Sequence, residues 1–205
     1  MKKPFLILLS ALLLFSACSK KNNISPDVPN TVNISGTFYP ITTIGSQIWT
    51  TVNYSGPGGY STSESNIYGT FFTPAQALTI NLPAGWRIPT IADYNKLLSN
   101  YTSTKDIDGY YRVSGNGAAG ALVSDSLING TNKSGFNALY GGFCSITSGQ
   151  VNYTPYTQAY FLTADSFNEI SFQIYGVMIT SDSAFITGYS DPNSLALSVR
   201  FVKDK

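Results

Sequence analysis

The sequence predicts a single domain rich in β-strands and loops, with two helices. Aromatic residues make up 14% of the 205 residues and charged residues only 11%, and there are 18 glycines. Such a composition is typical of sheets joined by turns rather than of a helical bundle. Two helix-start patterns and a series of apolar runs bounded by turn residues support this prediction. A chain of this length can bury a core without cross-links.

The N-terminus has the pattern of a secretory signal. Two lysines precede an apolar run over residues 5–15, which is too short for a membrane-spanning helix of about 20 residues. The segment Phe15-Ser-Ala-Cys18 resembles the lipobox of bacterial lipoproteins, which implies removal of residues 1–17 and acylation of Cys18. The acyl chains would anchor the protein in the lipid bilayer of the outer membrane, facing either the periplasm or the cell surface. An ordinary signal peptide with an incidental cysteine is the alternative.

Residues 18–33 are predicted to form a flexible tether, because the segment is polar and contains Pro26 and Pro29. The folded domain is predicted over residues 34–205. It begins with a β-hairpin whose strands cover residues 38–44 and 47–53, joined by a two-residue turn at Gly45-Ser46. Pro40 predicts that the first of these strands lies at a sheet edge or at a bulge.

The two predicted helices each begin with a capping pattern. Thr73 precedes Pro74 and is followed three residues later by Gln76, which predicts a helix that ends near residue 80. Thr90 stands in the same relation to Asp93 and predicts a second helix that ends near residue 100.

The remaining chain predicts a loop over residues 114–120 and a series of strands. The β-like runs are bounded by turn residues. They cover residues 110–113, 136–144, 158–162, 170–180, 184–188 and 195–202.

Six short motifs occur in an order that resembles a known family. They are Ile44–Trp49 with Asn53, Pro83–Thr90, Asn132–Leu139, Gly141–Phe143, Ala159–Phe161 and Ser198–Asp204. The chain resembles the Fibrobacter succinogenes major paralogous domain family, envelope proteins frequent in Bacteroidetes and Fibrobacteres. The resemblance implies an α+β, C-type-lectin-like fold, with two helices and a mainly antiparallel twisted sheet among long loops. The family has no established general activity to carry over.

Several motif residues are predicted to be structural rather than functional. Arg87 stands where a histidine is common in the family, so any role of that histidine is absent here. We expect Trp49 and Trp86 to be core anchors and Arg200 to pair or stack within a strand. The structural set comprises Trp49, Trp86, Arg87, Pro89 and Arg200.

The composition argues against several classes of chemistry. The chain contains no histidine, which excludes Ser-His-Asp catalysis and His-ligated zinc. The net charge of +1 gives no electrostatic footprint for nucleic acid. Asp106 and Asp108 resemble a solvated turn more than a calcium site, so no metal and no cofactor are predicted.

An aromatic and amide-rich segment is the candidate binding site. Aromatic faces and amide groups can contact sugars or peptides with little loss of entropy. The alternative is that these rings cover a small β core. The candidate residues are Tyr60, Asn152, Tyr153, Tyr156 and Tyr160.

Two serines lie in short sequences that resemble the O-glycosylation sequon of Bacteroidetes. They are Ser126 in Asp125-Ser-Leu127 and Ser183 in Asp182-Ser-Ala184. The resemblance implies that both serines can be modified.

Together these patterns predict a non-catalytic cell-envelope lipoprotein that binds extracellular glycan or protein ligands. Two alternatives stay open. One is a structural or assembly subunit whose exposed strand edges and aromatic loops pack against neighbouring proteins. The other is an enzyme whose carboxylates converge only in the fold.

Overall fold

The computed structural model describes residues 30–166, 174–189 and 193–205. The predicted signal peptide, Cys18 and most of the predicted tether lie outside the described residues. The first part of the strand predicted over residues 170–180 also lies outside the described residues.

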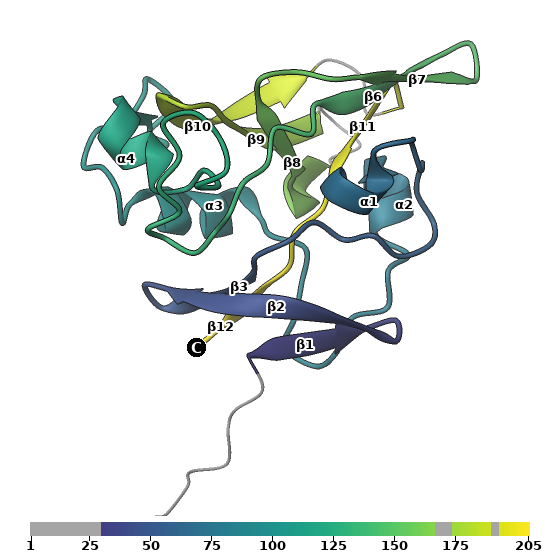
Figure 1. Cartoon of the computed structure of the whole chain (residues 1–205), viewed down its shortest axis with the longest axis horizontal. Helices are drawn as coiled ribbons and strands as arrows, with labels where there is room; N and C mark the ends of the chain where they lie inside the picture. Colours follow the sequence, from purple (N-terminus) through teal and green to yellow (C-terminus); the bar gives the residue numbers. More distant parts are fainter. Residues whose placement is uncertain (1–29, 167–173, 190–192) are drawn as a thin grey trace, which may run out of the picture.

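Two β-sheets pack against each other and dominate the described chain (Figure 1). The smaller sheet has four strands in the order β1-β2-β3-β12. The larger sheet has eight, in the order β5-β10-β9-β8-β11-β6-β7, with β4 also paired to β11. The strands are β1 (Thr31–Ile34), β2 (Thr37–Ile44), β3 (Gln47–Thr50), β4 (Phe71–Phe72), β5 (Val113–Ser114), β6 (Phe143–Thr147), β7 (Gln150–Thr154), β8 (Ala159–Leu162), β9 (Ile174–Ile179), β10 (Ser183–Tyr189), β11 (Leu195–Ser198) and β12 (Val202–Asp204).

The helices are few and short. Those in the described part are α1 (Ser65–Tyr68), α2 (Pro74–Ala77), α3 (Ile91–Leu98), α4 (Asn116–Gly120) and the 3₁₀ helix η1 (Ala164–Ser166). The capping boxes at Thr73 and Thr90 are both present, so the two predicted helix starts are confirmed. The first of these helices ends after one turn, and the second after eight residues.

The predicted α+β, C-type-lectin-like fold with two helices is wrong, because the described chain is mostly β and forms a β-sandwich. A capping box starts a helix without setting its length, and the strands supply most of the regular structure. The predicted loop at residues 114–120 is also corrected, since α4 occupies most of it.

The N-terminal hairpin is confirmed, but its position in the sheet differs from the prediction. Ile44 pairs with Gln47 across the turn, and Gly45 has a φ of 59°, as this turn requires. β2 is an interior strand, because β1 pairs with it on the side opposite β3. Pro40 is tolerated there because its nitrogen, which lacks a hydrogen, faces the β3 side of the sheet beyond the last residue of β3. No hydrogen bond of the β2–β3 ladder is therefore lost, and the Pro40 carbonyl still accepts one from the Thr51 N–H.

The chain that precedes the predicted domain boundary also joins the small sheet. β1 begins at Thr31, three residues before residue 34. Its pairing with β2 runs from Thr31 opposite Pro40 to Ile34 opposite Thr37.

Two apolar clusters hold the sheets together. In the first, the Trp49 ring contacts Tyr94 of α3 and Phe136, with ring centroids 5.1 and 5.6 Å apart. In the second, Tyr54 contacts Phe72 and Phe201 at 5.4 and 5.3 Å. Each cluster contains residues of both sheets, so burial between the sheets is the main source of stability.

The C-terminal run crosses from one sheet to the other. The predicted strand over residues 195–202 is in fact two, since β11 belongs to the larger sheet and β12 to the smaller. The predicted strand over residues 136–144 is corrected as well, because β6 begins only at Phe143. Asn137 has a φ of 57°, which is incompatible with a strand.

Candidate functional site

The structure divides the predicted binding residues into two groups. Tyr60 and Tyr153 line one surface pocket of about 520 Å³. Tyr156 and Tyr160 lie instead against Phe143. Asn152 is exposed and lies between Val151 and Tyr153 on β7, so its side chain points to the opposite face of the strand.

The pocket, called here the Tyr60–Tyr153 pocket, lies between a loop and an edge strand. The loop contributes Gly59, Tyr60, Ser61, Thr62 and Ser63, and β7 contributes Val151 and Tyr153. None of these lining residues is charged. Such a lining suits a neutral ligand with polar and aromatic groups.

Strand pairing explains why two residues so distant in sequence meet. β11 pairs with β6 through Ala196 and Cys144, and with β4 through Ser198 and Phe71. β6 and β4 therefore lie end to end along β11. Tyr153 pairs with Cys144, and Tyr60 pairs with Phe71, so both tyrosines occupy the next position outward.

Phe71 forms the support beneath the pocket. It is fully buried, and its ring lies 5.6 Å from that of Tyr153. Its backbone exchanges two hydrogen bonds with Tyr60, at 2.7 and 3.0 Å. A Cβ at Gly59 would lie 2.4 Å from the Phe71 carbonyl oxygen, so this position of the loop requires glycine.

The far side of the loop is fixed by a turn that leads into α1. The Thr62 N–H donates to the Ser65 hydroxyl at 2.7 Å, and the Glu64 N–H donates to the Thr62 hydroxyl at 3.2 Å. These local bonds hold the hydroxyl-bearing wall of the pocket in place without any ligand.

The Tyr153 phenol stays neutral. Burial raises its pKa, and the nearby Tyr68 and Glu64 raise it further. The hydroxyl oxygen is buried and has no hydrogen-bond partner among the described residues. The ring, rather than an ionised oxygen, is therefore what Tyr153 contributes to the pocket.

The second aromatic group is a surface stack. The Tyr156 and Phe143 rings are 5.3 Å apart and nearly parallel at 17°, and Tyr156 is 47% exposed. Tyr160 meets Phe143 edge-on at 5.5 Å and is itself buried. For Tyr160 the structure thus favours the alternative, in which the ring covers the core.

The predicted structural residues divide between core and periphery. Trp49 and Arg200 are almost fully buried, whereas Trp86 is half-buried at the border of the second cluster. Pro89 is buried, and its carbonyl accepts a hydrogen bond from the Ala164 N–H at 2.8 Å.

Arg200 joins three segments of chain. Its guanidinium donates to the Asn53 side-chain oxygen at 2.6 Å and to the carbonyls of Thr50 and Phe136, both at 2.9 Å. It donates also to the Asn137 carbonyl at 3.1 Å, and it lies over the Phe136 ring. Burial lowers the pKa of Arg200 to about 9, which leaves it charged at neutral pH.

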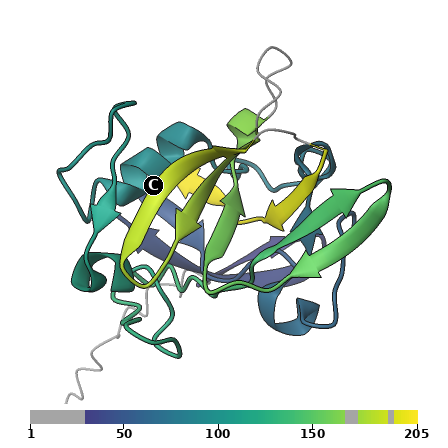
Figure 2. The ribbon, with the colours of Figure 1, turned by 90° about the horizontal axis from the view of Figure 1, so that it is seen from above.

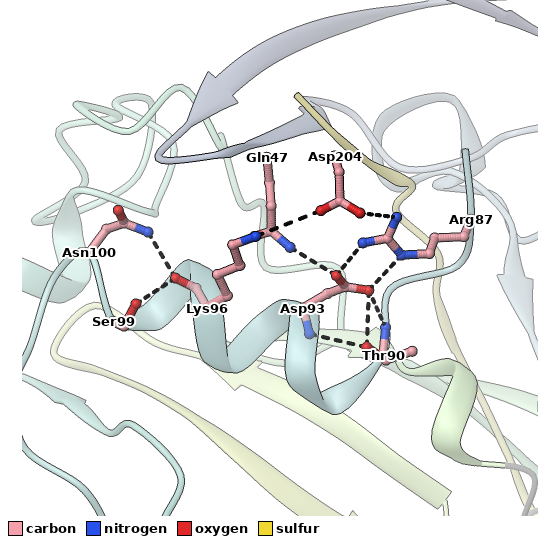
Figure 3. A network of polar contacts seen from close by, with 8 residues as sticks. All are labelled: Gln47, Arg87, Thr90, Asp93, Lys96, Ser99, Asn100 and Asp204. Atoms are coloured by element: carbon pink, nitrogen blue, oxygen red, sulfur yellow. Dashed lines mark hydrogen bonds and ion pairs between the residues drawn. The ribbon is translucent and has the colours of Figure 1, made fainter. Parts of the chain in front are cut away.

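Arg87 belongs to a polar network that ties the C-terminal strand to α3 (Figure 3). It donates to both carboxylate oxygens of Asp93, at 3.0 and 2.6 Å, and pairs with Asp204 of β12 at 3.1 Å. The buried Gln47 of β3 donates to Asp93 at 2.9 Å. The hydrogen bonds that Arg87 donates to Asp93 and Asp204 raise the pKa of its guanidinium, so its charge is constant.

The two serines predicted to be glycosylated flank a second pocket, of about 440 Å³, which sequence reasoning missed. Ser126 is exposed and Ser183 half-buried, and their neighbours Leu127 and Asp182 line the pocket. The other lining residues are Ile128, Tyr140, Thr157, Gln158, Thr180 and Ser181. Only the isolated Leu127-Ile128 pair in a polar stretch hints at it in the sequence.

The described residues give no grouping of His, Cys, Asp or Glu that could hold a metal ion. Asp106 instead accepts hydrogen bonds from the backbone N–H groups of Asp108 and Tyr110, which makes a local turn. Within the part of the chain that the structure describes, no helix has the length and apolar character needed to cross a bilayer.

Fold and site together define a β-rich domain with an uncharged surface pocket beside a sheet edge. The sequence matches the model of the Fibrobacter succinogenes major domain over residues 42–203, and the chain belongs to this family. The resemblance expected from the six motifs is thereby confirmed. No curated protein and no solved structure matches the chain.

Proposed function

We propose that this protein is a non-catalytic, lipid-anchored binding module of the cell envelope, and that its ligand site is the Tyr60–Tyr153 pocket. The observation that carries the proposal is the pocket itself. Strand pairing brings together two of the aromatic residues that the sequence singles out, beside a fixed wall of serine and threonine. The ligand is an extracellular glycan or protein.

The position of the pocket supports this proposal. The described chain starts at the small sheet, whereas β7, the last strand of the large sheet, lies at the opposite end of the view from β1 (Figure 1). An anchor at Cys18, joined to β1 by the predicted tether, would attach at the small sheet and leave the pocket uncovered by its own attachment point. Metabolic labelling with a fatty-acid analogue, lost in Cys18→Ala, tests the anchor.

The binding test uses the fragment of residues 30–205, because both apolar clusters lie within it. The probes are a glycan array and a display library of random linear peptides. We expect Tyr60→Ala and Tyr153→Ala to abolish binding of any hit. Tyr156→Ala is the matched control, since this exposed tyrosine lies outside the pocket, and it should bind as the wild type does. Loss in Tyr156→Ala alone would move the site to the surface stack.

A further inference from the structure

The free edge of β7 lies beside the pocket, and we infer that an extended polypeptide segment binds there as an additional strand, with alternate side chains entering the Tyr60–Tyr153 pocket. This inference rests on the proposed function and names the ligand class. Figure 2 shows the β6–β7 hairpin at one side of the large sheet. β7 is the last strand in the order, and no described strand pairs with its outer side.

The hairpin register decides which backbone groups face outward. The two-residue turn at Ser148-Gly149 has φ values of 51° and 76°, which makes Thr147 and Gln150 a hydrogen-bonded pair. Pairs alternate along an antiparallel ladder, so Ile146–Val151 and Cys144–Tyr153 are not hydrogen-bonded to each other. The Ile146 N–H indeed donates in the opposite direction, to the Ser194 carbonyl at 2.7 Å.

The N–H and C=O groups of Val151 and Tyr153 therefore point away from β6. They take part in none of the hydrogen bonds found for the described chain. Val151 and Tyr153 are also the two β7 residues that line the pocket. A strand bound to their backbone would place its facing side chains on the pocket side, because directly opposed residues share a face.

The edge also lacks the usual protection against an added strand. Natural edges are commonly blocked by charged residues, proline or a bulge. β7 reads Gln-Val-Asn-Tyr-Thr and has none of these, and its pairing with β6 is regular over all five residues. The adjoining pocket is uncharged, so we expect neutral polar or aromatic side chains at alternate ligand positions.

The length of the edge favours a peptide over a second copy of this chain. Five residues span only about 17 Å, and two of them offer outward groups. A stable dimer buries roughly 800 Å² on each partner, which one short strand does not supply. A peptide needs only these backbone bonds and a side chain in the pocket.

The test begins with peptides selected from the random linear library on the 30–205 fragment. Amide hydrogen exchange is then measured by NMR with and without a selected peptide. We expect new protection at the Val151 and Tyr153 amides and no change at Asn152, which already bonds to β6. Val151→Pro, which removes one outward N–H, should weaken binding at least about ten-fold. Val151→Ala shortens the same pocket-lining side chain but keeps that N–H, so it is the reference variant, and Val151→Pro should bind at least about ten-fold more weakly than Val151→Ala.

Each other outcome overturns a defined part of the inference. Strand addition is refuted if Tyr153→Ala abolishes binding but the peptide leaves both amides unprotected and Val151→Pro binds as well as Val151→Ala. In that case the proposed function of the pocket still stands. A screen with hits only among glycans has the same meaning. No hit in either screen overturns both proposals. If the two amides become protected without peptide, and more so at higher protein concentration, the edge binds a second copy of this chain instead of a peptide. A native-like thermal transition of Val151→Pro is required in every arm.

Discussion

The replacement Asp93→Ala should destabilise the protein by more than the loss of its ion pair with Arg87 alone. Asp93 is 6% exposed and is the N3 residue of the α3 capping box, where it accepts from the Thr90 N–H at 3.0 Å. Loss of such a cap costs about 1 kcal/mol. The same change removes the acceptor of the Gln47 side-chain amide, which donates to Asp93 at 2.9 Å. Gln47 is fully buried, so its N–H would be left without a partner. An unpaired buried donor costs about 1–3 kcal/mol.

The ion pair with Arg87 adds less to this cost. The Arg87 side chain is 36% exposed, so solvent screens the pair and its contribution is about 0.5 kcal/mol. We therefore expect Asp93→Ala to lower the free energy of unfolding by about 3 kcal/mol in urea titrations at neutral pH. Lys96→Ala is the control. Its exposed ammonium lies 3.7 Å from Asp204, and it should cost less than about 0.5 kcal/mol. A loss below about 1 kcal/mol in Asp93→Ala would refute the assigned role of the network.

The network also predicts how stability responds to acid. Burial alone would raise the pKa of Asp93, but the hydrogen bonds from Arg87 and Thr90 outweigh it and lower the pKa below 3.8. The unfolded state then takes up the proton first as the pH falls. The stabilisation by the Asp93 charge is complete above about pH 3.8 and is lost as the pH falls through the lower, folded-state pKa. The stability difference between wild type and Asp93→Asn should therefore shrink below that pH, and a constant difference would contradict the linkage.

Three further outcomes follow from burial. Arg200→Met leaves three carbonyls and the Asn53 amide oxygen without a donor, and should cost more than about 4 kcal/mol in urea unfolding; a loss under about 2 kcal/mol would contradict this. Trp49→Ala should cost about 3–5 kcal/mol in thermal unfolding and Trp86→Ala less than half as much, because only Trp49 is fully buried. Equal losses would disprove the difference. Burial raises the pKa of Cys144 to about 11, so a thiol reagent should label the native protein at pH 8 at least about 100-fold more slowly than the unfolded chain. Rapid labelling in native buffer would show that the thiol is accessible.

The sequence predicted those parts of the fold whose causes are local. A capping box needs a hydroxyl and a side chain three residues apart, so Thr73 and Thr90 could be identified as helix starts. The turn at Gly45-Ser46 was equally visible, because its geometry depends on two residues. Family membership followed from ordered motifs and is confirmed. The fold class implied by the resemblance is not, because the lengths of helices and the pairing of strands depend on the whole chain.

Pro40 shows how a correct local rule can give a wrong global position. Proline disrupts a ladder only where its N–H would have had a partner. Whether that partner exists depends on where β3 ends and on the presence of β1, which lies in a stretch too polar to predict as a strand. The polar segment at residues 30–33 became ordered through backbone pairing with β2, a contact that composition does not encode.

The grouping of the site residues also depends on the pairing of strands that are distant in the sequence. Tyr60 and Tyr153 share a pocket only because β11 pairs with both β4 and β6. Ser198 lies opposite Phe71, and Ala196 lies opposite Cys144. A shift of one residue in either register would turn the side chains of that strand to the other face. The small buried cluster of Phe71, Cys144 and Ala196 under the pocket fixes both registers at once. The same core contacts that stabilise this end of the sheet therefore also set the geometry of the pocket. An aromatic-rich segment in the sequence could indicate candidate binding residues, but it could not show which of them share a pocket.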